Sequence, residues 1–227
     1  MPNMGRALRA ASGGWVYHVL NRSNMRLPIF ESEADYEAFE RVLTEGVARF
    51  QPRLLSYCLM PNHWHLVAWP EEDGLLSRFV GWVTLTHTQR YHAHRHTIGG
   101  GHLYQGRFKS FPVQQDEHFH TLCRYVERNA LRANLVKEPD LWRYSSLWRM
   151  THGDAEAQSL VSRWPVKRPK DWLKIVRRAQ TEGELKALRQ SVRRGVPYGG
   201  PRWTKRTIAE LGLEMTVRPR GRPKNGS

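Results

Sequence analysis

The stretch LMPNHWHLVAWP, residues 59–70, decides the fold and gives the first indication of chemistry. Its apolar and aromatic content is typical of a β-strand, in which side chains two positions apart leave on the same face. His63 and His65 therefore point to one side, while Trp64 and Leu66 point to the other. Two neutral imidazoles on one face can bind a divalent metal ion. Alternatively, the two histidines are polar side chains on the solvent-exposed face of a half-buried strand.

The segments around this strand predict a mixed pattern of strands and helices. Residues 31–50 have an acidic first turn and apolar side chains at helical spacing, and Pro52 ends this helix. The predicted order is strand 14–22, helix 31–50, strands 53–60 and 63–69, helix 75–95, a strand or hairpin arm over 103–114, and helix 116–136. This order favours an α+β domain with helices packed on one face of an antiparallel sheet.

The positive charge of the chain is concentrated near its end. The 227 residues carry a net charge of +15, and residues 163–227 hold 18 Lys and Arg against 5 Asp and Glu. Such a basic block predicts a polyanionic partner, either nucleic acid or an acidic membrane surface, although a solvated tail is the simpler alternative. We expect a catalytic domain over 1–150 and a basic extension over 151–227, with helices near 182–194 and 204–211.

Two further features bear on the compartment. Cys58 and Cys123 lie in apolar segments, which predicts buried thiols and a reducing compartment. No apolar run approaches the roughly 20 residues that span a bilayer, and the first residues lack the apolar core of a secretory signal. The sequence therefore predicts a cytoplasmic protein with no membrane partner.

The helix predicted over 116–136 carries a second group of candidate site residues. Tyr125 and Asn129 are four positions apart, so they share one side of a helix, beside its apolar stripe. A tyrosine hydroxyl has a pKa of about 10 and is a poor nucleophile at neutral pH, but a divalent cation can polarise the group that it attacks. The Asn129 oxygen could join the two imidazoles as a metal ligand. Alternatively, Tyr125 is an amphipathic residue at the border of the core.

Together these motifs resemble a known family. PNHWHLV followed by YVERNALRANLV is similar to the HUH single-tyrosine DNA transposases, and most of all to the REP-associated tyrosine transposases. The resemblance runs from about residue 14 to the end of the chain, because GWVYHVLNRSNMRLPIF, HLYQGRFKSFPV, RRGVPYGGPRW and RPRGRPK also look like segments of that family.

The resemblance implies a fold, a chemistry and a substrate. The fold would be a ferredoxin-like HUH domain, in which His63 and His65 form the metal pair, Asn129 completes the Mg²⁺ or Mn²⁺ site and Tyr125 is the nucleophile. Tyr125 would attack single-stranded DNA, form a 5′-phosphotyrosine and release a 3′-hydroxyl, and a second 3′-hydroxyl would reverse the step. The substrates would be REP hairpins with a short guide sequence at the foot.

Two basic segments are candidates for holding DNA. Arg107, Lys109 and Ser110 would position the cleaved strand, unless they form an exposed polar face. PRGRPK, residues 219–224, has the form of an AT-hook, so Arg220, Arg222 and Lys224 are candidates for the minor groove. The helical row Arg124, Arg128 and Arg132 could follow the DNA backbone, but we favour a solvated face of the helix for it.

Several alternatives remain open from the sequence. His92, His94 and His96 offer another metal site, although they are expected on the surface, and His18 is expected to be structural or close to DNA. Glu127 is not expected to be a ligand. A domesticated transposase that only binds hairpins is the main alternative function. A zinc hydrolase would need an acidic cluster, which residues 60–130 do not offer. A monomer is favoured over a dimer.

Overall fold

The protein is built around one antiparallel sheet, which a computed structural model describes with its surrounding helices over residues 11–218. The strands lie in the order β2-β3-β1-β4, so the strand that carries the histidine pair is interior. In the register between β1 and β3, His65 lies opposite Leu20 and His63 opposite Arg22. The strands are β1 (Val16–Arg22), β2 (Arg53–Met60), β3 (His63–Trp69) and β4 (Lys109–Val113).

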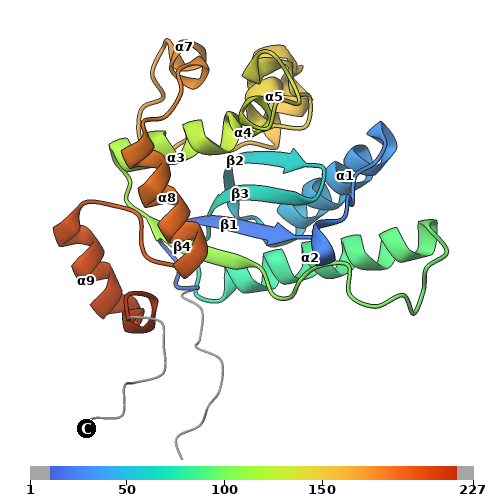
Figure 1. Cartoon of the computed structure of the whole chain (residues 1–227), viewed down its shortest axis with the longest axis horizontal. Coiled ribbons are helices and arrows are strands. Elements are labelled where there is room, and N and C mark those ends of the chain that lie inside the picture. The colour runs from blue at the N-terminus through green and yellow to red at the C-terminus, as the bar shows by residue number, and fades with distance from the viewer. Residues whose placement is uncertain (1–10, 219–227) are drawn as a thin grey trace, which may run out of the picture.

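Two long helices, α1 (Glu33–Phe50) and α2 (Leu75–His94), cover one face of the sheet (Figure 1). The first begins with a capping box, in which Ser32 and Asp35 each accept a hydrogen bond from the backbone N–H of the other. Trp64 is fully buried on this face, in a core with side chains of both helices. The helices predicted over 31–50 and 75–95 are therefore confirmed.

The other face of the sheet is covered as well. Its core joins Val67 and Phe111 to side chains of α3, α5, α7 and α8. The α+β class is confirmed, but the expectation of helices on a single face is wrong. Neighbouring residues of β2, such as Leu54 and Leu55, are both fully buried, because this strand is covered on both sides. The remaining helices are α3 (Glu117–Glu127), α4 (Asn129–Arg132), α5 (Ser146–His152), α6 (Ala155–Ser159), α7 (Trp172–Arg177), α8 (Glu182–Arg194) and α9 (Pro201–Leu211).

Two predicted elements are shorter than expected. The helix predicted over 116–136 stops at Glu127, and Arg128 has non-helical backbone angles before the short α4 begins. The Arg128 guanidinium donates 2.7 Å to the Arg177 carbonyl, a long-range contact that local patterning does not reveal. The strand predicted over 103–114 is confined to β4, because residues 103–108 form a loop with one isolated bridge.

The outer edge of β2 is covered by later parts of the chain. The Ser162 backbone N–H donates 2.7 Å to the Leu54 carbonyl, and the Trp164 indole donates 2.7 Å to the Leu55 carbonyl. Residues 142–146 bond the other end of the strand in the same way. This edge strand is therefore paired along much of its length.

The extension packs onto the sheet domain. Trp164, Trp172 and Leu188 belong to the same core as the β2 side chains, and α8 lies beside β4 (Figure 1). The helix predicted over 182–194 is confirmed, and the next one begins at 201 rather than 204. The AT-hook-like segment lies outside the described residues.

Two further findings concern the cysteines and the character of the helices. Cys58 and Cys123 are free and buried, as predicted. Over residues 11–218, none of the helices combines the length and the apolar character that crossing a membrane requires.

Candidate active site

The histidine pair is oriented by two polar neighbours. The rings of His63 and His65 have centroids 5.0 Å apart; His65 is buried and His63 partly exposed. His63 Nδ1 lies 2.7 Å from Asn62 Oδ1, and His65 Nδ1 lies 2.8 Å from His18 Nε2. Because these contacts occupy both Nδ1 atoms, the Nε2 atom of each ring is available to a ligand. His18 therefore has an orienting role at this site.

The surroundings of these imidazoles keep them neutral. Burial lowers the pKa of His18 and His63 to about 3, and it lowers the pKa of His65 well below its usual value. The positive charges of Arg22 and Arg132 lower the pKa of the pair further. Because a metal ligand must be unprotonated, this donor set fits a divalent cation. The pair stays neutral well below pH 6.5, where an ordinary imidazole becomes protonated.

Tyr125 lies next to this pair. Near the end of α3, its ring packs edge-on against His65, with ring centroids 5.9 Å apart. The side chain is 8% exposed, and the Arg132 guanidinium lies over the ring at 4.1 Å. The structure thus brings together a phenol, an imidazole pair and a guanidinium from distant parts of the sequence.

Asn129 is close to the same group but faces a different partner. It is buried at the start of α4, and its Oδ1 accepts a hydrogen bond from Arg132 Nη2 at 2.6 Å. Its oxygen is therefore engaged by a guanidinium rather than by the histidine pair. A role as metal ligand stays a prediction, and it requires this hydrogen bond to open.

Two arginines were missed or misassigned from the sequence. Arg132 was expected on a solvated helix face, which is wrong: it packs over Tyr125, while Arg124 pairs with Glu184 at 2.5 Å. Arg22 could have been found only through its register opposite His63. Within residues 11–218, the buried atoms Arg22 Nε, Arg132 Nη1 and Asn129 Nδ2 have no hydrogen-bond partner. Buried donors without partners favour an anionic ligand in this region.

A basic groove begins beside Arg22. It has a volume of about 490 Å³ and runs between the end of β1, the loop before β4 and α8. Arg107 and Lys109, two of the predicted DNA contacts, line it together with Arg22 and Arg193. Its lining residues include no acidic side chain. We call these four cations and the hollow between them the β4 groove.

Ser110 is placed differently from its neighbours. In the register between β1 and β4 it lies opposite Val19, whereas Lys109 lies opposite Leu20. Because successive strand residues alternate between faces, Ser110 points away from the face that carries His65. Arg220, Arg222 and Lys224 lie outside the described residues.

The other candidates are remote from this site or engaged elsewhere. His92 Nδ1 contacts Thr97 at 2.8 Å near the end of α2. Asp116, Glu117 and His118 could together hold a metal, but Asp116 already caps the start of α3, about 12 Å from Tyr125 along the helix. Glu127 is buried and bonded to Ser56, Ser146 and Trp172, which agrees with its exclusion as a ligand.

Two solved structures are similar to this chain. A solved REP-associated tyrosine transposase bound to a REP hairpin has the same fold, with a TM-score of 0.55, 16% sequence identity, and coverage of 78% of this chain and 93% of that chain. A proposed transposase from Deinococcus radiodurans R1 shows 15% identity and a TM-score of 0.40, covering 55% of this chain and 97% of that one. No curated protein matches the chain.

The hairpin-bound structure shows a shared fold, and the family match defines the class of the chain as transposase-like. The sequence profile described as "Transposase IS200 like" matches residues 12–129, more than half of the chain. The chain belongs to this family, and the resemblance seen in its motifs is confirmed.

Proposed function

We propose that this protein is a metal-dependent endonuclease and strand transferase that acts on single-stranded DNA at REP-type hairpins. The observation that carries the proposal is the position of Tyr125, packed edge-on against His65 and beneath the Arg132 guanidinium. The family supports transposase-like chemistry, and the similar solved structure holds a REP hairpin.

In the proposed reaction, the Tyr125 hydroxyl attacks a phosphodiester of the DNA. A bond forms between Tyr125 Oη and phosphorus as the bond to the 3′-oxygen breaks, so the phenol loses a proton and the departing 3′-oxygen gains one. The product is a 5′-phosphotyrosine with a free 3′-hydroxyl. Another 3′-hydroxyl can attack this ester and release Tyr125, and the retained ester bond makes an external energy source unnecessary.

The residues around the tyrosine have distinct roles in this proposal. His63 and His65, with Asn129 once its bond to Arg132 opens, would hold Mg²⁺ or Mn²⁺, which would polarise the phosphodiester. The unpaired N–H groups of Arg22 and Arg132 would donate to the non-bridging phosphate oxygens. Burial keeps the imidazoles unprotonated, and the same two charges lower their pKa further.

The DNA would reach this site through the β4 groove. Arg107 and Lys109 line it, and phosphate contacts of this kind position a strand without reading its sequence. Arg220, Arg222 and Lys224 would add contacts to the minor groove at the hairpin foot. Ser110 is on the opposite face from Lys109, so any DNA contact that it makes lies outside this groove.

The test is covalent capture of DNA. Single-stranded palindromes from the DNA that flanks the gene are incubated with the protein and Mn²⁺, and a denaturing gel detects the protein–DNA adduct. We expect Tyr125→Phe to lose the adduct while it keeps hairpin binding, and Tyr91→Phe on α2 to behave like wild type. An adduct that survives in Tyr125→Phe places the nucleophile elsewhere. Hairpin binding without any adduct favours the non-catalytic alternative.

A further inference from the structure

A second groove lies at the opposite edge of the sheet from the β4 groove. It has a volume of about 910 Å³ and is bordered by α5, α6 and the segment 161–168. That segment bonds to β2, so this groove follows the β2 edge, whereas the β4 groove lies near β1 and β4. We call it the β2-edge groove and define it by Arg163, Trp164, Lys167 and Arg168.

The charge of this groove is entirely positive. Arg163, Lys167 and Arg168 line it, and its lining residues include no Asp or Glu. Arg163 and Lys167 are exposed, and within residues 11–218 neither side chain forms an ion pair. Arg168 is 3.9 Å from the buried Glu127, so its charge is partly compensated. Two uncompensated cations therefore face the solvent along one wall.

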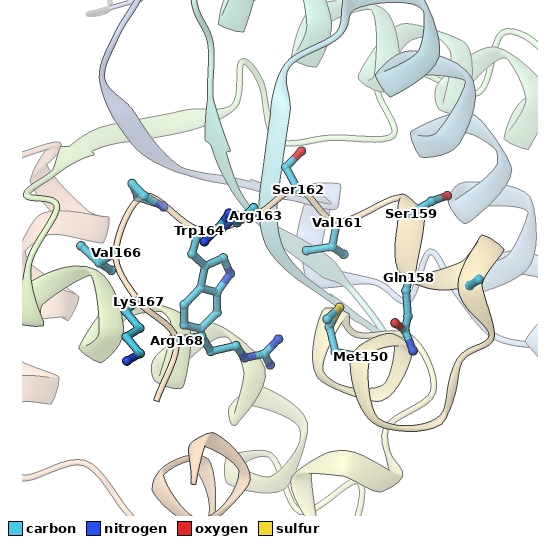
Figure 2. A pocket seen from close by; sticks show the side chains of 12 residues that line it. Met150, Gln158, Ser159, Val161, Ser162, Arg163, Trp164, Val166, Lys167 and Arg168 are labelled. Carbon is cyan, nitrogen blue, oxygen red and sulfur yellow. The ribbon is translucent and has the colours of Figure 1, made fainter. Parts of the chain in front are cut away.

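The aromatic ring in the groove is not free to stack on a base. Figure 2 shows Arg168 running along Trp164 towards Met150, and its guanidinium lies 4.7 Å from the ring centroid. The indole also packs against Phe119, His120 and Trp172, and its N–H donates to the Leu55 carbonyl. Proteins that bind single strands without sequence preference combine cations with exposed aromatic faces. Cations without such a face suit the phosphate backbone of a duplex instead.

We propose that the β2-edge groove binds the phosphate backbone of the double-stranded hairpin stem, through Arg163 and Lys167. This inference rests on the proposed function, in which the single-stranded foot occupies the β4 groove. The two grooves are separated by roughly the width of the sheet, about 14 Å for four strands. A stem of about ten base pairs is about 34 Å long, so one hairpin can reach both grooves.

The experiment measures binding of three labelled oligonucleotides to the full-length protein: a hairpin with its foot, the blunt stem-loop alone, and the single-stranded foot alone. We expect Arg163→Ala/Lys167→Ala to weaken binding of both stem-containing oligonucleotides by about tenfold or more, because two phosphate contacts are lost. The slope of log K against log salt should become shallower by about 1.8. Foot binding should be unchanged.

The control variant is Arg41→Ala/Arg78→Ala, which removes the same charge from exposed positions on α1 and α2. It should bind all three oligonucleotides like wild type, and thermal unfolding checks that both variants fold. Unchanged hairpin binding by the Arg163/Lys167 variant overturns the inference. If the Arg163/Lys167 variant loses as much affinity for the single-stranded foot alone, the stem is not the occupant of the β2-edge groove. Wild-type protein that binds none of the three overturns the proposed function itself.

Discussion

At the scale of single residues, the site depends on how each imidazole is turned. Asn62 and His18 contact the Nδ1 atoms of His63 and His65, which leaves both Nε2 atoms available to a ligand. Partners of this kind fix the ring orientation and the tautomer of metal-ligating histidines. In the proposed function, His18 would thus affect metal binding without being a ligand itself.

Replacement of His18 tests this role. We expect His18→Phe, which keeps an aromatic ring beside Phe111, to lower the affinity for Mn²⁺ by about 10- to 100-fold, because the His65 ring loses its partner. His92→Ala, at a histidine near the end of α2, should leave the affinity unchanged. Titration calorimetry with Mn²⁺ measures both. Equal affinities for all three proteins would contradict the orienting role.

A different histidine makes stability sensitive to acid. His87 is buried on the α1 and α2 side, and burial lowers its pKa to about 3. Its Nδ1 is hydrogen-bonded to the Tyr104 hydroxyl at 2.7 Å, and that hydroxyl accepts a hydrogen bond from the Trp64 indole. Between pH 6.5 and 3 the unfolded chain is protonated at this position and the folded chain is not. Stability should therefore fall as the pH drops below about 6.5.

His87→Asn separates this effect from that of the other histidines, because the asparagine amide can still form a hydrogen bond with the Tyr104 hydroxyl. We expect the free energy of unfolding of the variant to depend less steeply on pH, by up to about 1.4 kcal/mol per unit below pH 6. Urea unfolding between pH 4.5 and 7 measures the slope. If the free energies of unfolding of the two proteins depend on pH with the same slope, His87 does not change its protonation on unfolding.

At the scale of elements, the tyrosine helix is fastened to the extension. Glu127 accepts from Ser146 and from the Trp172 indole, both at 2.7 Å, so α3 is joined to α5 and α7 just past Tyr125. Arg128 and Arg124 make further contacts with α7 and α8. The end of α3 is thus held by segments far along the chain.

Trp172→Phe tests this attachment by removing one hydrogen bond and keeping an aromatic ring. We expect the free energy of unfolding to fall by about 1–3 kcal/mol, because a buried carboxylate oxygen loses its closest donor. Trp148→Phe on α5 is the matched control, since its indole N–H makes no hydrogen bond within the described residues. Denaturant unfolding compares them, and equal stabilities would contradict the role of this bond.

These contacts explain which parts of the fold could be predicted. Local patterns located β2, β3, α1 and α8 nearly to the residue, since apolar spacing and capping residues lie within each segment. Local patterns did not predict the helix break at Arg128, because its guanidinium bonds the distant Arg177 carbonyl. They also did not predict the position of Arg132, which follows from that break. Two features depend on strand register, which the pattern of a single strand does not fix. They are the position of Arg22 opposite His63 and the face of the sheet on which Ser110 lies.

At the scale of the whole molecule, positive charge lines both grooves. The β4 groove has Arg107 and Lys109, the β2-edge groove has Arg163 and Lys167, and acidic residues line neither. The concentration of charge in residues 163–227, noted from the sequence, therefore accounts for only part of the cationic surface. Binding of DNA should depend strongly on salt as a result.

The end of the chain provides a separate test of this dependence. We expect Arg220→Gln/Arg222→Gln/Lys224→Gln to weaken hairpin binding and to reduce the slope of log K against log salt by about 2.7, if all three cations meet phosphates. The same three changes at Arg41, Arg78 and Arg90, on α1 and α2, form the control. Fluorescence anisotropy over a salt series measures both. An unaltered slope would show that these three residues do not contribute to DNA recognition.

The covered edge of β2 has a consequence for synthesis of the protein. An open strand edge is a template on which another chain can add a strand. Here the residues that close it, 142–146 and 162–164, follow the sheet by some thirty to fifty positions, so they leave the ribosome after all four strands. A nascent chain that stalls before residue 142 would expose this edge and be prone to aggregate.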